Sequence, residues 1–279
     1  MKDDDSHIDA SSAPLIEHLV ELRQRLMYAL GALAVCAGIC FIFYAQLYQV
    51  LSYPLLNVDP DAKIQTLSPQ EAFFTVMNLS IWGGFFFGFP LIAFQLWRFV
   101  APGLYRSEQS AFLPFLIASP FLFICGASLA YFLVIPLALD FLIGFAESAA
   151  SAQGVAIENV NRFSEYIGFI KVMLLAFGAS FQLPVLLTLM GRAGLVTAAG
   201  LAGGRKYAVV GIAAMAAIIT PPDVISQIAL GGSVYILYEI SIHLVRLAEM
   251  RRARERAEDE EDWDEDEDLE TASQPDAGP

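Results

Sequence analysis

The sequence predicts an all-α integral membrane protein whose six kinked transmembrane helices form a concave bundle. Two observations indicate this class. Hydrophobic residues make up 56% of the 279 positions, charged residues make up 16%, and the mean hydropathy is +0.55. The apolar residues also gather in runs of about 20, the length of helix that crosses a hydrocarbon core. A soluble domain of this length carries more charge.

Six apolar segments, separated by polar or proline-bearing stretches, are predicted to span the membrane. They cover residues 26–47, 73–97, 112–136, 165–190, 206–220 and 224–245. The fifth is short, since the residues from Tyr207 to Thr220 give only about 21 Å of helix against a core of about 30 Å. We expect this span to lie where the bilayer is thinned or beside a partner.

Prolines are expected to bend or end several of these helices, because proline removes a backbone hydrogen bond and clashes with the preceding turn. Pro221 and Pro222 should end the fifth span, and Asp223 is placed to cap the sixth. Bent helices favour a concave bundle, which is how we interpret the prolines inside the other spans: Pro90, Pro114, Pro120, Pro136 and Pro184.

Lysine and arginine indicate the orientation. Thirteen of them lie in the terminal segments and in the loops after the second and fourth spans, whereas only Lys63 and Arg162 lie in the loops on the other side. Positive residues concentrate on the cytoplasmic side of membrane proteins. Both termini are therefore predicted to be cytoplasmic, which agrees with an even number of spans.

The membrane domain is predicted to cover residues 14–246, flanked by two disordered cytoplasmic segments. Residues 1–13 are polar and acidic and do not look like a cleavable signal peptide. Residues 247–279 start basic and then become strongly acidic: from residue 255 onward there are thirteen acids and one arginine, so most of the net charge of −14 belongs to this tail. Block charge with few apolar residues favours disorder.

Two of the polar residues inside the fourth span call for a partner or an exit to the interface. Lys171 and Gln182 are three helical turns apart and share a face. Lys171 can either extend outward to the interface or face the protein interior, and the sequence leaves both open. Gln182 lies nearer the middle, so we expect its amide to hydrogen-bond a partner helix.

Carboxylates and aromatic rings gather on the cytoplasmic side. In "PLIEHLVELRQRL", Glu17 and Glu21 are one turn apart and should repel each other. The loop after the second span adds Phe99, Tyr105 and Glu108. The aromatic residues could simply form an interfacial belt. They could also form the walls of a site with carboxylates at its edge, which suits a guanidinium group.

Four segments resemble the TatC subunit of the twin-arginine protein translocase. They are "PLIEHLVELRQRL" before the first span, "FVAPGLYRSE" after the second, "AFGASFQLPV" in the fourth and "TPPDVISQ" opening the sixth. They occur in the family's order and cover the chain from about Pro14 to Arg246. Each segment is weakly specific alone, but four in order across six spans are strongly specific.

The resemblance implies a membrane receptor and core translocase subunit, not an enzyme. Proteins of this family bind the signal peptides of folded cargo that carry consecutive arginines. They assemble with TatA- and TatB-like single-span proteins and with further copies of themselves in the cytoplasmic membrane of prokaryotes. Transport is driven by the proton motive force, so the resemblance implies no cofactor and no nucleic acid.

The resemblance also assigns roles to single residues. Peptide recognition falls to Glu21, Arg23, Phe99 and Glu108, with secondary places for Glu17 and Tyr105. Partner-helix docking falls to Thr220 and Gln227, with Gln182 as a further docking position, and Pro54 has a structural role. One departure is Gln182, where members of the family often carry glutamate: an amide keeps the hydrogen bonding but has no titratable charge.

Two other classes were weighed. A small-solute secondary transporter would need a charged pair or broken helices at the middle of the membrane, and this sequence offers only Lys171 and Gln182. An intramembrane enzyme would need nucleophile, paired-aspartate or zinc-ligand patterns, and none is found. We expect no metal site, because Cys36, Cys40 and Cys125 lack accompanying ligands at usual spacings.

Overall fold

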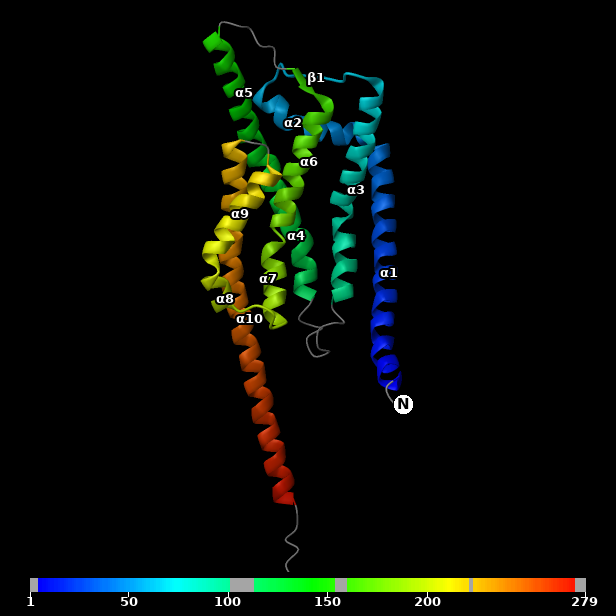
Figure 1. Ribbon diagram of the computed structural model, residues 1–279, viewed down its shortest axis with the longest axis vertical. Helices are drawn as coiled ribbons and strands as arrows, with labels where there is room; N and C mark the ends of the chain where they lie inside the picture. Colours follow the sequence, from blue (N-terminus) through cyan, green and yellow to red (C-terminus); the bar gives the residue numbers. More distant parts are fainter. Residues whose placement is uncertain (1–4, 101–112, 154–159, 221–222, 274–279) are drawn as a thin grey trace, which may run out of the picture. The chain divides into compact units, whose positions relative to one another are not determined.

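The computed structural model describes the backbone of residues 5–100, 113–153, 160–220 and 223–273 (Figure 1). The chain divides into two compact units, Met1–Gln182 with Ala213–Gly232 and Leu183–Ile212 with Ser233–Pro279. The elements in chain order are α1 (Asp5–Ile42), α2 (Tyr44–Val58), β1 (Lys63–Gln65), α3 (Pro69–Val100), α4 (Leu113–Leu129), the π-helix η3 (Ala130–Val134), α5 (Ile135–Gln153), β2 (Val160–Arg162), α6 (Phe163–Ser180), α7 (Leu183–Arg192), α8 (Ala198–Gly203), α9 (Arg205–Ile219) and α10 (Val224–Ser273).

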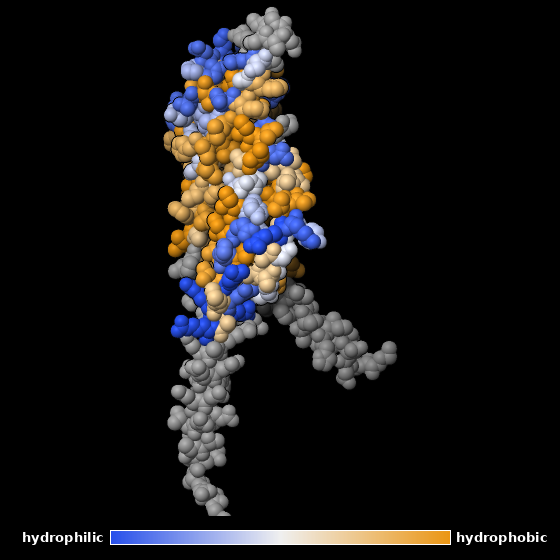
Figure 2. Space-filling model, turned by 90° about the vertical axis from the view of Figure 1, so that its left-hand side faces the viewer, coloured by the Kyte–Doolittle hydropathy of each residue, from blue (hydrophilic) through white to orange (hydrophobic). Residues whose placement is uncertain are grey.

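The described residues confirm an all-α membrane protein. Five helical stretches are long and apolar enough to cross a membrane: Leu19–Ile42, Pro69–Leu96, Phe115–Ser148, Phe163–Arg192 and Val224–Arg254. The remaining predicted span, the fifth, corresponds to α9, which has 15 residues and so a length of about 22 Å. Figure 2 shows hydrophobic side chains over much of the visible surface, as a lipid environment requires.

Three spans differ clearly from their predicted bounds. The first ends at Ile42 instead of residue 47, because the helix breaks at Phe43 and residues 44–47 belong to α2. The third continues without a gap through η3 and α5 to Gln153, so Pro136 does not end it. The π-helical turn of η3 lies directly before this proline. The fourth is broken into α6 and α7 at Phe181 and Gln182. The break precedes Pro184, which cannot donate to the carbonyl of Ser180 and whose ring clashes with it.

The terminal helices extend into the segments that were predicted to be disordered. α1 starts at Asp5, and α10 continues to Ser273 through most of the acidic segment. Alanine, arginine and glutamate have high helix propensity, which accounts for a helix there. The predicted disorder of these segments in solution stays a prediction.

α1 and α3 lie side by side and run antiparallel (Figure 1). Gly84 of α3 allows their closest approach, because a Cβ at this position would lie 2.5 Å from the backbone nitrogen of Ala37. Gly88, one turn along α3, lies against Cys36 on the same face of α1. Small residues of this kind let helices pack closely in a bilayer, where the hydrophobic effect does not hold them together.

α4 and α6 form the buried centre of the first unit. A Cβ at Gly178 of α6 would lie 2.6 Å from the ring of Phe123, which is 1% exposed. The ring of Phe89 from α3 stacks on the same Phe123 ring, with centroids 3.9 Å apart. Three helices therefore meet at one aromatic side chain.

Pro54 interrupts α2, and two tyrosines from other helices complete its hydrogen bonding. Proline has no N–H to donate to the carbonyl four residues earlier, which here belongs to Val50. The hydroxyl of Tyr131 donates to that carbonyl at 2.6 Å, and the hydroxyl of Tyr166 donates to the next one, of Leu51, at 2.7 Å. The structural role expected for Pro54 thus has a physical basis in this geometry.

A short parallel strand pair, which the sequence did not predict, joins the loops after the first and third spans. β1 pairs with β2 from Lys63–Val160 to Gln65–Arg162. Glu71, at the start of α3, accepts from the side chains of Arg162 at 2.9 Å and Ser164 at 2.6 Å. The carboxylate raises the pKa of Arg162 by hydrogen bonding and by its charge.

The second unit has its own core, centred on four buried residues: Ala198, Tyr238, Ile242 and Val245. Arg205 forms a two-point ion pair with Glu239, at 2.7 and 2.9 Å, and this carboxylate raises the pKa of the arginine. The hydroxyl of Tyr238 donates to the carbonyl of Leu201 at 2.7 Å. These bonds connect α8 and α9 to α10.

Candidate functional site

The packing of α1 on α3 places Glu21 and Phe99 at the same level. Gly84 lies opposite Ala37, and both helices rise about 1.5 Å per residue in opposite directions. Fifteen residues farther along α3 is Phe99, and fifteen residues back along α1 is Leu22, next to Glu21 and Arg23. The C-terminal end of α3, with Phe99, therefore lies beside the part of α1 that carries Glu21 and Arg23 (Figure 1).

Glu21 is held by its own helix but keeps an accessible carboxylate. Arg25, one turn later, donates to Oε1 of Glu21 at 3.1 Å. The side chain of Glu21 is 30% exposed and that of Arg25 is 20% exposed. Among the described side chains, no other hydrogen bond to Glu21 is present, so its second oxygen can accept from a ligand. The pair follows the favourable i, i+4 order that the sequence indicated.

The other predicted peptide-recognition residues fall in three groups. Arg23 is exposed on α1, and Phe99 is partly buried at the end of α3. Glu17 lies in α1, but its side chain is outside the described residues, and Tyr105 and Glu108 are outside them entirely. Their roles stay predictions.

Gln182 uses its amide within the chain. Its Nε2 donates to the carbonyl of Ser119 at 2.9 Å, and the Ser119 hydroxyl donates to its Oε1 at 2.6 Å. The partner-helix bond expected from the sequence thus has an intramolecular counterpart, a bond to α4 at the break between α6 and α7. Ser119 could not be identified from sequence, because serine in an apolar helix more often bonds its own backbone.

The structure also shows the surroundings of the predicted residues around the start of α10. Asp223 caps α10 as predicted, since its Oδ1 accepts from the backbone N–H of Ser226 at 2.7 Å. Thr220 is buried, and its hydroxyl donates to the carbonyl of Ala216 at 2.9 Å. Gln227 is partly exposed. Pro221 and Pro222 lie outside the described residues.

Sequence reasoning missed the two-point pair of Arg205 with Glu239. Arg205 was counted only as a charge that sets orientation, and the two residues are 34 positions apart. No periodicity connects α9 with α10, so this pairing has no signal in a single sequence.

Comparison with known proteins shows the family. The sequence model described as "Sec-independent protein translocase protein (TatC)" matches residues 17–232. TatC of Magnetococcus marinus is 42% identical over 252 residues, covering 90% of each chain, and TatC of Aquifex aeolicus is 39% identical over 239 residues, covering 86% of this chain and 97% of its own.

A solved structure supports the same family assignment. A crystal structure described as the twin-arginine translocase receptor TatC aligns with a TM-score of 0.72 and 39% identity, covering 83% of this chain and 99% of that one. The order and spacing of the four motifs, the helical membrane fold and these matches lead to one conclusion. The chain belongs to the TatC family of Sec-independent protein translocase proteins.

Proposed function

We propose that this chain is the receptor and core subunit of a twin-arginine translocase and binds the signal peptides of folded proteins where the C-terminal end of α3 lies beside the Glu21 region of α1. The observation that carries the proposal is the common level of Glu21 and Phe99, set by the Gly84–Ala37 contact. Glu108 and Tyr105 from the following loop, and Glu17 from α1, would complete the site.

The chemistry favours arginine in the peptide. A guanidinium can stack on the ring of Phe99 and donate two parallel hydrogen bonds to a carboxylate, whereas an ammonium offers only a point charge. Each charge-assisted bond contributes about 1.5–3 kcal/mol. Two adjacent arginines, one on Glu21 and one on Glu108, would therefore distinguish a twin-arginine peptide from its twin-lysine form. Arg23 would orient a carboxylate or contact a lipid phosphate.

The proposal also covers the orientation of the chain in the bacterial inner membrane and its partners in the Sec-independent translocase. The asymmetry of lysine and arginine supports cytoplasmic termini. Partners would be TatA- and TatB-like single-span proteins and further copies of the chain, with transport driven by the proton motive force. Docking would involve Gln182, Thr220 and Gln227, of which Thr220 is already buried and bonded within its helix.

The test is peptide binding to the full chain in nanodiscs. Twin-arginine and twin-lysine versions of one signal peptide are titrated against wild type, Glu21→Gln, Glu108→Gln and the control Asp61→Asn, an exposed residue beyond α2. We expect arginine selectivity in wild type and the control, and its loss in both glutamate variants. Equal binding of the two peptides to wild type, or full binding by either glutamate variant, would contradict the proposed site.

A further inference from the structure

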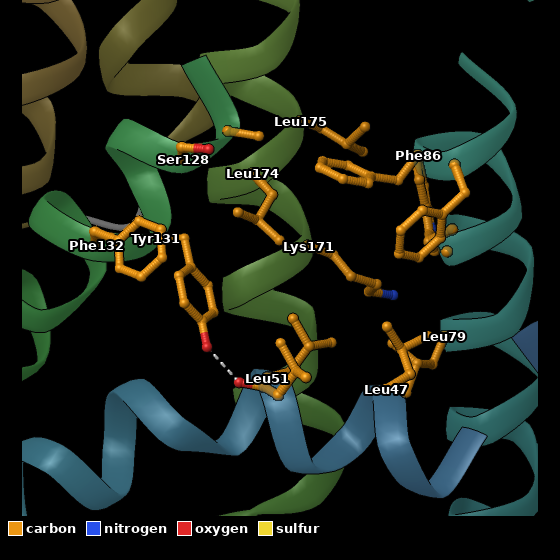
Figure 3. A pocket seen from close by; sticks show the side chains of 15 residues that line it. Leu47, Leu51, Leu79, Phe86, Ser128, Tyr131, Phe132, Lys171, Leu174 and Leu175 are labelled. Carbon is orange, nitrogen blue, oxygen red and sulfur yellow. Dashed lines mark hydrogen bonds between the residues drawn. The ribbon is translucent and has the colours of Figure 1, made fainter. Parts of the chain in front are cut away.

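Lys171 faces an apolar cavity between helices of the first unit. The cavity has a volume of about 280 Å³ and is lined by side chains from α2, α3, α4, η3 and α6. Figure 3 shows the Lys171 side chain crossing it from α6 toward α3, among leucine and aromatic side chains. Of the two orientations that the sequence left open, the structure has the inward one.

The partners of the ammonium in the described part of the chain are neutral. It donates to the side-chain carbonyl of Asn78 and lies 5.7 Å from the centre of the Trp82 ring. Both contacts favour the charged form. Among the described residues no carboxylate pairs with Lys171, although Arg25, Arg162 and Arg205 all have one. An uncompensated cation in an apolar site is costly and usually serves a function.

The lining selects for a ligand that is mostly apolar with one anionic end. Besides Lys171, the polar side chains in the lining are those of Trp82, Ser128 and Tyr131, and the Tyr131 hydroxyl is already committed to the Val50 carbonyl. Lys171 is eight residues, about 12 Å of helix, from the start of α6, so its ammonium lies in the half of the span that is nearer to the head groups at that end.

We propose that this cavity binds an anionic phospholipid, with one acyl chain against the apolar walls and the phosphate on Lys171. Charge and lining together favour a lipid, because its phosphate would pair with Lys171 while its acyl chain covers the apolar side chains. A single acidic side chain from a neighbouring helix would satisfy the charge but leave most of the apolar lining uncovered.

The test is lipid binding to the full chain in detergent, measured by native mass spectrometry. Phosphatidylglycerol is compared with phosphatidylcholine of the same acyl chains, and with glycerol phosphate, which has the phosphate but no chain. We expect the anionic lipid to bind at least about tenfold more tightly than the zwitterionic one, because the choline cation beside the phosphate repels Lys171 and leaves that head group with no net charge. Glycerol phosphate should not compete.

Four variants separate the contribution of the Lys171 charge to lipid binding from the contribution of the cavity volume. Lys171→Met should abolish the preference for phosphatidylglycerol, and Lys171→Arg should keep it. Lys206→Met is the matched control, since Lys206 also lies over a ring, that of Tyr207 at 5.0 Å, but away from the cavity, and it should keep the preference. Leu174→Trp, which fills the cavity, should weaken binding of both lipids.

Three results would overturn the proposal. One is equal affinity of wild type for the two phospholipids, and another is an unchanged preference in Lys171→Met. The third is competition by glycerol phosphate as strong as that by the lipid, which would indicate a simple anion site. If Lys171→Met left lipid binding unchanged but released a co-purified single-span protein, the cation would serve that partner instead.

Discussion

The contact between α1 and α3 should determine both stability and peptide binding, and Gly84→Ala tests it. The added Cβ would lie 2.5, 2.6 and 2.7 Å from the N, Cα and Cβ of Ala37. Ordinary contact starts at 3.4 Å, so the helices must separate by about 0.9 Å. Two of the three atoms are backbone, and a side-chain rotation cannot relieve the clash. Overpacking of this kind costs about 1–3 kcal/mol.

Gly38→Ala in α1 is the matched control, because nothing lies within 4 Å of a Cβ there. Both variants gain the same helix propensity, about 0.5–1 kcal/mol. The difference between their unfolding free energies, measured by circular dichroism during denaturation in micelles, therefore isolates the overpacking cost of about 1–3 kcal/mol. Gly84→Ala should also bind a twin-arginine peptide more weakly, because α1 carries Glu21 away from Phe99. Equal stability and equal peptide affinity of the two variants would refute this account of the site.

Three further predictions concern single hydrogen bonds. Tyr131→Phe leaves the Val50 carbonyl without its donor and should lower the unfolding free energy by about 1 kcal/mol, measured by the same denaturation. Ser119→Ala removes one of the two bonds to Gln182 and should cost a similar amount; no change would show that the pair does not stabilise the break in the fourth span. Arg162→Lys keeps the charge but loses the planar donor geometry, so amides of β1 and β2 should exchange faster in hydrogen exchange, while those of α6 stay unchanged.

The sequence predicted those features that depend on local pattern. Hydropathy located the spans, and an aspartate directly after two prolines indicated a helix cap that the structure confirms at Asp223. The same local rules predicted that Pro184 would bend the fourth span. They did not show that the helix would break there completely instead of bending, because that depends on whether another helix supplies hydrogen bonds at the break, as Ser119 does for Gln182.

What the sequence could not predict depends on residues far apart in the chain. The i, i+11 spacing puts Lys171 and Gln182 on one face, but it does not say what that face contacts. Asn78, which bonds Lys171, is 93 positions away. The peptide site lies between these two cases. Its residues were predicted from family resemblance, not from local pattern. The register of α1 against α3 then gives a geometric reason why Glu21 and Phe99 lie at the same level.

The two tyrosine bonds to α2 have a consequence for biosynthesis. The carbonyls of Val50 and Leu51 accept from hydroxyls that lie 81 and 115 residues later in the chain. A growing chain is made from its N-terminus, so α2 leaves the ribosome long before Tyr131 and Tyr166 exist. Until the third span has been inserted, water or lipid head groups must satisfy the Val50 carbonyl, because Pro54 cannot donate to it. The Leu51 carbonyl has the N–H of Leu55 within α2 and gains its second donor, Tyr166, with the fourth span. α2 can therefore reach its final bonded state only after more than half of the protein has been synthesised.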